Sequence, residues 1–154
     1  MSDVRSISDR IAIADLTPAY AKHARRVERG VAMLHRHSVL VQDEIETRKA
    51  AAVRWSVHTP AAVALSDDSR TATLRDGGES LTVGILAPEK VRFEVRDSTP
   101  FRESPDPPGQ HRNDRIRKLA IHLPQATSAR LAVLFASAGA AAKEDAPIRP
   151  LAQW

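Results

Sequence analysis

The stretch Val53-Arg54-Trp55-Ser56-Val57-His58 alternates apolar and polar side chains at every residue. A β-strand with one buried face has this pattern, because successive side chains point to opposite faces of the sheet. Short strands at close spacing, without a convincing amphipathic helix, predict an all-β fold: an antiparallel β-sandwich of about ten strands. The same period of two recurs in four further segments, at Val39–Ile45, Leu81–Ile85, Val91–Val95 and Leu119–Leu123.

The dipeptide Gly77-Gly78 predicts one hairpin. Glycine adopts the positive φ angles that two-residue loops between antiparallel strands need. Such a loop places Leu74 opposite Leu81 and, two residues further from the turn, Ala72 opposite Val83. We therefore expect two paired strands here, with apolar side chains on a shared face.

A second hairpin follows from the position of Asp43, which lies in phase with the apolar residues Val41 and Ile45. A carboxylate on an apolar face needs a charged or hydrogen-bonding partner. A loop over residues 34–38 places Arg29 opposite Asp43 on the neighbouring strand. The register therefore predicts a structural ion pair between Arg29 and Asp43.

The composition fits one globular domain over residues 1–154, with a strand-rich body at 9–136 and an extended tail at 137–154. The chain has 154 residues, of which 42% are hydrophobic and 27% charged, a size that suits a single core. No apolar run approaches the roughly 18 residues of a membrane span, and the N-terminus lacks the apolar segment of a signal peptide. Prolines at 100, 105, 107 and 108 predict one long Pro-rich loop.

The charge balance limits the partners and cofactors that we expect. The 23 Lys and Arg residues exceed the 19 Asp and Glu residues, and the formal charge is +4. This excess either attracts an acidic polymer or reflects ordinary solvated faces. We expect no nucleic-acid partner, because no helix-turn-helix, zinc-finger or RNA-binding motif is present. We expect no metal or other cofactor, because cysteine is absent and the histidines lack ligand spacing.

Six phrases then occur in a fixed order: Asp15–Tyr20, Val39–Ile45, Trp55–Thr59, Leu81–Pro88, Lys118–Leu123 and Arg149–Trp154. In this order they resemble the C-terminal β region of the heparinase II/III-like polysaccharide lyase family. The resemblance covers nearly the whole chain from about Asp9. It implies an antiparallel β domain that follows a helical (α/α) toroid, β-elimination of uronic-acid polysaccharides, and a periplasmic or secreted location.

The resemblance does not extend to catalytic residues. The family's toroid with its tyrosine and Asn-His pair, its His-x-His-x-Asp segment and its His-Asn segment have no matching positions here. We therefore expect no catalytic residue, an accessory role beside the missing toroid, and no activity of the chain alone. The alternative is a stand-alone β-sandwich module that binds acidic polysaccharide.

Four residues are candidates for contact with that polysaccharide. His58 and Arg54 lie on the polar phase of their strand, where they face either a substrate cleft or solvent. Arg112 and Asn113 lie in the Pro-rich loop, and loops on a rigid β scaffold often carry binding groups. For each of them, the alternative is an ordinary hydrogen-bonded or solvated polar residue.

Other aromatic residues have structural interpretations. Trp55 shares the apolar phase of its strand, which places it in the core rather than in a sugar platform. Tyr20 is the only tyrosine and lies in a Pro-containing connector without an evident base, so we expect it to pack rather than to act as an acid. Leu151 and Trp154 are expected to dock the end of the tail.

Overall fold

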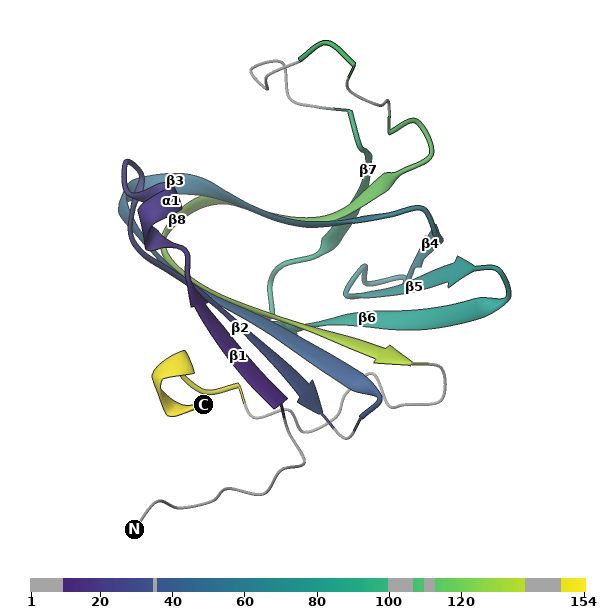
Figure 1. Cartoon of the computed structure of the whole chain (residues 1–154), viewed down its shortest axis with the longest axis horizontal. Helices are drawn as coiled ribbons and strands as arrows, with labels where there is room; N and C mark the ends of the chain where they lie inside the picture. The colour runs from purple at the N-terminus through teal and green to yellow at the C-terminus, as the bar shows by residue number, and fades with distance from the viewer. Residues whose placement is uncertain (1–9, 35, 100–106, 110–112, 138–147) are drawn as a thin grey trace.

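The computed structural model describes residues 10–34, 36–99, 107–109, 113–137 and 148–154. They contain one turn of helix, α1 (Thr17–Tyr20), a terminal 3-10 turn, η1 (Leu151–Gln153), and eight strands. The strands are β1 (Arg10–Asp15), β2 (Ala24–Leu34), β3 (Ser38–Thr59), β4 (Ala62–Leu65), β5 (Thr71–Asp76), β6 (Glu79–Ala87), β7 (Phe93–Asp97) and β8 (Arg117–Ser137). All pairs are antiparallel, in the order β1-β2-β3-β8-β6-β5-β4, and β7 pairs with β8 off this path (Figure 1).

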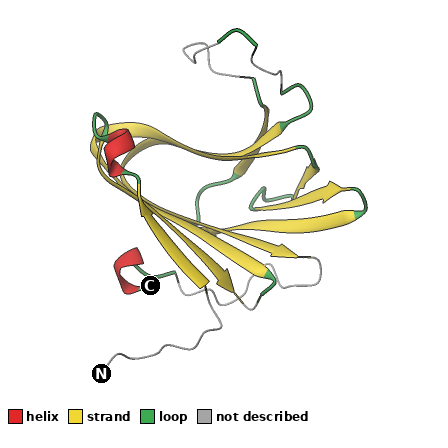
Figure 2. Ribbon diagram, viewed as in Figure 1, coloured by secondary structure: helices red, strands yellow, loops and turns green. Residues whose placement is uncertain are grey.

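Two long strands carry this sheet around a bend. β3 has 22 residues and β8 has 21, and their mutual register shifts between Glu46 and Val53. On one side of the shift, β3 also pairs with β2, and β8 also pairs with β6. On the other side, β8 pairs with β7 in place of β6. The sheet therefore folds into a large layer and a small layer, the latter made of β7 and residues 51–59 and 117–126 (Figure 2).

The main core lies between these two layers. The small layer contributes Trp55, Leu119 and Ile121, and the large layer contributes Val83 and Val133 among others. All five side chains are at most 6% exposed. Because complete burial of one such side chain contributes roughly 1.5–3 kcal/mol, this cluster is the chief stabilising feature of the fold. The assignment of Trp55 to the core is confirmed.

The prediction of an all-β antiparallel fold is confirmed, but the separate sheets of a sandwich are not found. The described residues form one continuous sheet of eight strands, where about ten were expected. Residues 46–53 contain no glycine or proline, so nothing breaks β3, and an irregularity in its pairing absorbs the bend instead. Of the Pro-rich loop and the tail, residues 100–106, 110–112 and 138–147 lie outside the described residues.

Both predicted hairpin registers are confirmed. Leu74 faces Leu81 across the two glycines of the β5–β6 loop, whose φ angles are 55° and 88°. In the β2–β3 hairpin, Arg29 faces Asp43. Turn chemistry and a period of two therefore sufficed to align these four strands.

The predicted buried face of β3 is wrong over its first half. Ser38, Leu40, Gln42 and Glu44 are at most 8% exposed, whereas Val39 and Val41, which were expected on the buried face, are only partly buried. The end of the tail covers Gln42 and Glu44: Gln42 Nε2 donates to the carbonyl oxygen of Arg149 at 2.7 Å, and the Leu151 amide donates to Glu44 Oε1 at 3.1 Å. Leu151 is 1% exposed, so the expected docking of this residue is observed.

Candidate functional site

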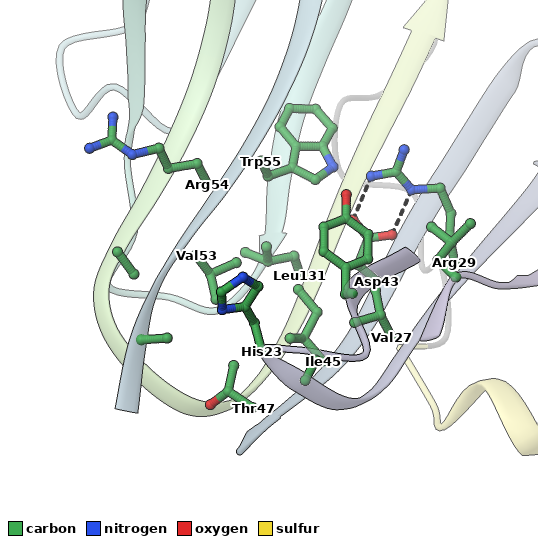
Figure 3. A pocket seen from close by; sticks show the side chains of 15 residues that line it. His23, Val27, Arg29, Asp43, Ile45, Thr47, Val53, Arg54, Trp55 and Leu131 are labelled. Carbon is green, nitrogen blue, oxygen red and sulfur yellow. Dashed lines mark hydrogen bonds and ion pairs between the residues drawn. The ribbon is translucent and has the colours of Figure 1, made fainter. Parts of the chain in front are cut away.

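A pocket of about 180 Å³ lies between α1, β2 and the bend of β3. Its position follows from the bend, because residues 51–55 turn away from the large layer there. The apolar side chains that line it are Leu16, Ala24, Val27, Ile45, Ala51, Ala52, Val53, Trp55 and Leu131 (Figure 3). The polar ones are Tyr20, His23, Arg29, Asp43, Thr47 and Arg54.

The predicted pair of Arg29 and Asp43 forms part of this pocket. Arg29 Nε and Nη2 donate to Asp43 Oδ1 and Oδ2 at 2.7 and 2.8 Å, which is a bidentate geometry. Asp43 is 5% exposed, whereas the side chain of Arg29 is 42% exposed. The hydrogen bond to Asp43 raises the pKa of Arg29 above its ordinary value, so the pocket contains a permanently charged guanidinium in a fixed orientation.

α1 brings Tyr20 and His23 to the same pocket. Its single turn begins at Thr17 and has Pro18 in the first positions, where proline is tolerated. Thr17 Oγ1 accepts the amide hydrogen of Val27 at 3.0 Å, which fixes α1 to β2. Tyr20 is 51% exposed, so its ring lies at the rim rather than in the core.

Sequence reasoning did not foresee this combination of Tyr20, His23 and Arg29. We expected Tyr20 to lack chemical partners, but all three residues line the pocket, and Tyr20 reinforces the raised pKa of Arg29. No pattern in the sequence shows that the chain turns back after α1, where the His23 amide donates to the Tyr20 carbonyl oxygen at 2.8 Å. A tyrosine, a histidine and a cation are groups that bind or protonate oxygen-rich ligands.

A second group of polar side chains lies on the outer face of the small layer. Strand pairing places His58 beside Lys118, and Lys118 beside Arg96, across three adjacent strands. We call these three residues the cationic row. Arg54 lies on the same face and pairs with His122. The structure thus brings the candidates His58 and Arg54 onto one face.

Two residues of the cationic row have hydrogen-bond acceptors among the described residues. Arg96 Nε donates to Glu94 at 2.7 Å, and Lys118 Nζ donates to the carbonyl oxygen of Thr99 at 3.0 Å. Cations directly opposite each other on neighbouring strands repel and so destabilise the pairing. An anion bound across the row would offset that cost.

The candidates from the Pro-rich loop remain predictions. Arg112 lies outside the described residues. Asn113 is exposed, and its carbonyl oxygen accepts hydrogen bonds from Ser98 Oγ at 2.6 Å and from the Ile116 amide at 2.9 Å. Its backbone therefore helps to close the base of the loop.

Arg70 is an important residue that sequence reasoning missed. Its guanidinium donates to backbone carbonyl oxygens of Ile85, Pro88, Glu89 and Val91, and it joins β5 to the segment before β7. No periodicity or motif signals this role, because the partners are main-chain atoms.

Two kinds of feature are absent from the described part of the chain. No group of three or more His, Asp or Glu side chains there is arranged to hold a metal ion. No helix there is long and apolar enough to cross a membrane.

Solved structures with a similar fold include heparinase III. One heparinase III matches 86% of this chain with a TM-score of 0.61 and 14% identity. The fold is similar to part of heparinase III. A second structure of heparinase III matches with a TM-score of 0.61 and 11% identity. The heparan sulfate lyase HepC from Pedobacter heparinus matches with a TM-score of 0.58 and 10% identity. Each match covers 86% of this chain. No family model and no curated protein matches the sequence.

These similarities concern the fold and a limited part of each neighbour. The chain spans 20% of the length of each of these three proteins. One fold hosts many functions, so the function must be argued from the pocket and the cationic row.

Proposed function

We propose that this chain is a β-sheet domain of a polysaccharide lyase of the heparinase II/III type. In this role it supplies one wall of the substrate site, and a helical toroid supplies the catalytic groups. The observation that carries the proposal is the TM-score of 0.61 to heparinase III over 86% of the chain. The six ordered sequence phrases, which extend to Trp154, support the same relationship.

The chemistry of the surface agrees with an acidic polysaccharide as the ligand. Carboxylate and sulfate groups bind to guanidinium and ammonium groups through charge-assisted hydrogen bonds. Lys118 and Arg96 of the cationic row offer such groups on neighbouring strands, Arg54 adds a guanidinium on the same face, and the His58 imidazole can donate a hydrogen bond. We propose His58, Arg54, Arg112 and Asn113 as contact residues, together with Lys118 and Arg96.

We further propose that the domain is inactive alone. β-Elimination needs a base for the proton at C5, an acid for the leaving oxygen and a neutralising group for the uronate carboxylate. The sequence resemblance carries no residue over to any of these roles. Tyr20, His23 and Arg29 share a pocket, and they are the residues to substitute first if the isolated chain proves active.

An assay for the unsaturated uronate product tests this proposal. The purified chain is incubated with heparan sulfate, chondroitin sulfate and alginate, and ultraviolet absorbance is followed, with a heparinase III as positive control. We expect no increase with any substrate. A sustained increase that is lost in Tyr20→Phe or His23→Ala would show that the chain carries its own catalytic groups.

The cationic row also favours a second candidate function, a stand-alone module that binds acidic polysaccharide. An accessory wall binds the polymer weakly until its catalytic partner completes the cleft, whereas a stand-alone module binds it tightly alone. Calorimetric titration with heparan sulfate separates them: a submicromolar Kd for the isolated chain favours the module, and a weaker, salt-sensitive Kd favours the accessory wall.

A further inference from the structure

We propose that the pocket between α1, β2 and β3 binds a single hexuronate ring, with the ring carboxylate on Arg29 and an apolar ring face against the floor that contains Trp55. The choice of a uronate rests on the proposed function. Binding in the pocket is nevertheless a separate property, which can be tested with a monosaccharide.

One cation of the lining is placed to bind an anion. The side chain of Arg29 lies at the pocket, whereas that of Arg54 points away from it (Figure 3). Asp43 is the one carboxylate among the lining residues, and both of its oxygens already accept hydrogen bonds from Arg29. No second carboxylate among the lining residues opposes an anion beside Arg29.

Arg29 is suited to receive the carboxylate. Its bonds to Asp43 use Nε and one N–H group of Nη2, so within the described part of the chain Nη1 keeps its two N–H groups for a ligand. Asp43 also holds the guanidinium in place, which removes much of the ordering cost that a flexible arginine would pay on binding.

The floor and the hydroxyl groups match a sugar ring. Val27, Leu131 and Trp55 are buried and present apolar surface to the pocket, as Figure 3 shows for the side chains around Asp43. Thr47 Oγ1 donates to the carbonyl oxygen of Ala126 at 2.7 Å, so its oxygen can accept a hydrogen bond from a sugar hydroxyl. The Tyr20 hydroxyl at the rim can donate or accept.

The size of the pocket limits the ligand to one ring. Its volume of about 180 Å³ lies below the roughly 300–1,000 Å³ of pockets for drug-sized molecules. A hexuronate has about thirteen non-hydrogen atoms, and at ordinary ligand efficiency it would bind with millimolar affinity.

The two tryptophans allow a direct test. Trp55 lines the pocket, whereas Trp154 contacts Gly30 on the other face of the sheet. In a Trp154→Phe background, Trp55 becomes the only tryptophan and reports on the pocket by fluorescence. We would titrate sodium glucuronate, with glucose as the control for the ring without a carboxylate and acetate as the control for the carboxylate without a ring, at constant ionic strength.

We expect a saturable, millimolar change in Trp55 fluorescence with glucuronate, at least tenfold weaker with glucose or acetate. Ala51→Leu, which fills the pocket, should abolish the change, and Arg75→Ala on β5 should leave it intact. Circular dichroism would establish that both variants are folded. No saturable change with glucuronate, or equal changes with glucose, would overturn the inference.

Titration of heparan sulfate into the Ala51→Leu variant separates this inference from the proposed function. If glucuronate does not bind in the pocket but the polysaccharide still binds, the pocket inference fails and the proposed polysaccharide-binding role stands. If neither ligand binds the chain without these substitutions, both fail.

Discussion

Arg29 on β2 lies directly opposite Asp43 on β3, and two of its nitrogens donate to both carboxylate oxygens at 2.7 and 2.8 Å. This ion pair links two neighbouring strands of the sheet, and both of its residues line the candidate pocket. Asp43 is buried at the base of the pocket, whereas the side chain of Arg29 is partly exposed where a ligand would bind.

Removal of one partner should destabilise the domain more than removal of both. Arg29→Met leaves the Asp43 carboxylate buried without its cation, and we expect a loss of about 2–3 kcal/mol in the free energy of unfolding. This is less than the roughly 3–5 kcal/mol of a fully buried pair, because Arg29 is partly exposed. The double variant Arg29→Met/Asp43→Leu should recover most of the loss in urea denaturation. Equal stability of the single and double variants would contradict this account.

Glu44 should anchor the end of the chain. Its Oε1 accepts hydrogen bonds from Arg130 Nε at 2.9 Å and from the Leu151 amide at 3.1 Å. We expect Glu44→Ala to cost about 2–3 kcal/mol, because several charge-assisted hydrogen bonds are lost and buried donors are left unpaired. Trp154 fluorescence should shift to longer wavelength as η1 detaches. Glu46→Ala, an exposed neighbour on β3, is the matched control, and a similar shift in that variant would argue against an anchor at Glu44.

Gly30 should be required for the docking of η1. A Cβ atom at this position would overlap Leu151 Cδ2 and would lie 2.8 Å from Trp154 Cζ3. We expect Gly30→Ala to cost about 1–3 kcal/mol through overpacking. In a Leu151→Ala/Trp154→Ala background, the same substitution should cost much less, as a double-mutant cycle would show. An unchanged cost in that background would mean that η1 is not the obstacle.

Asp68 should make stability depend on acid pH. The hydrogen bond from Ser66 Oγ at 2.6 Å lowers the pKa of Asp68 below its ordinary value, and the Arg70 amide contributes at 3.0 Å. A carboxyl whose folded-state pKa is depressed stabilises the fold above its unfolded pKa, and this contribution disappears as the pH falls through the folded-state pKa. The urea midpoint of Asp68→Asn should therefore lie below that of the natural chain at neutral pH and converge with it in strong acid. A constant difference at all pH values would exclude this linkage.

The sequence predicted those features of the fold that depend on near neighbours. A period of two and a pair of glycines fixed the β5–β6 register, and the awkward phase of Asp43 identified its partner. The burial of Gln42 was not predicted, because its partner Arg149 lies 107 residues away. Nothing in the alternation of a strand shows that a distant segment covers its second face.

The candidate site was predicted only in part for the same reason. The residues of the pocket come from α1, β2, β3 and β8, and the bend of β3 brings them together. The outer positions of His58 and Arg54 followed from strand phase, but their alignment with Lys118 and Arg96 required the pairing of β8 with both β3 and β7.

The most direct test of the central claim is a calorimetric titration of heparan sulfate into the purified chain at low and at physiological ionic strength, with uncharged dextran as the control. We predict saturable binding to heparan sulfate that weakens as salt screens the cationic row, and no heat of binding with dextran. The absence of binding at low ionic strength, or equal binding of dextran, would contradict the claim that this β-sheet domain contacts an acidic polysaccharide.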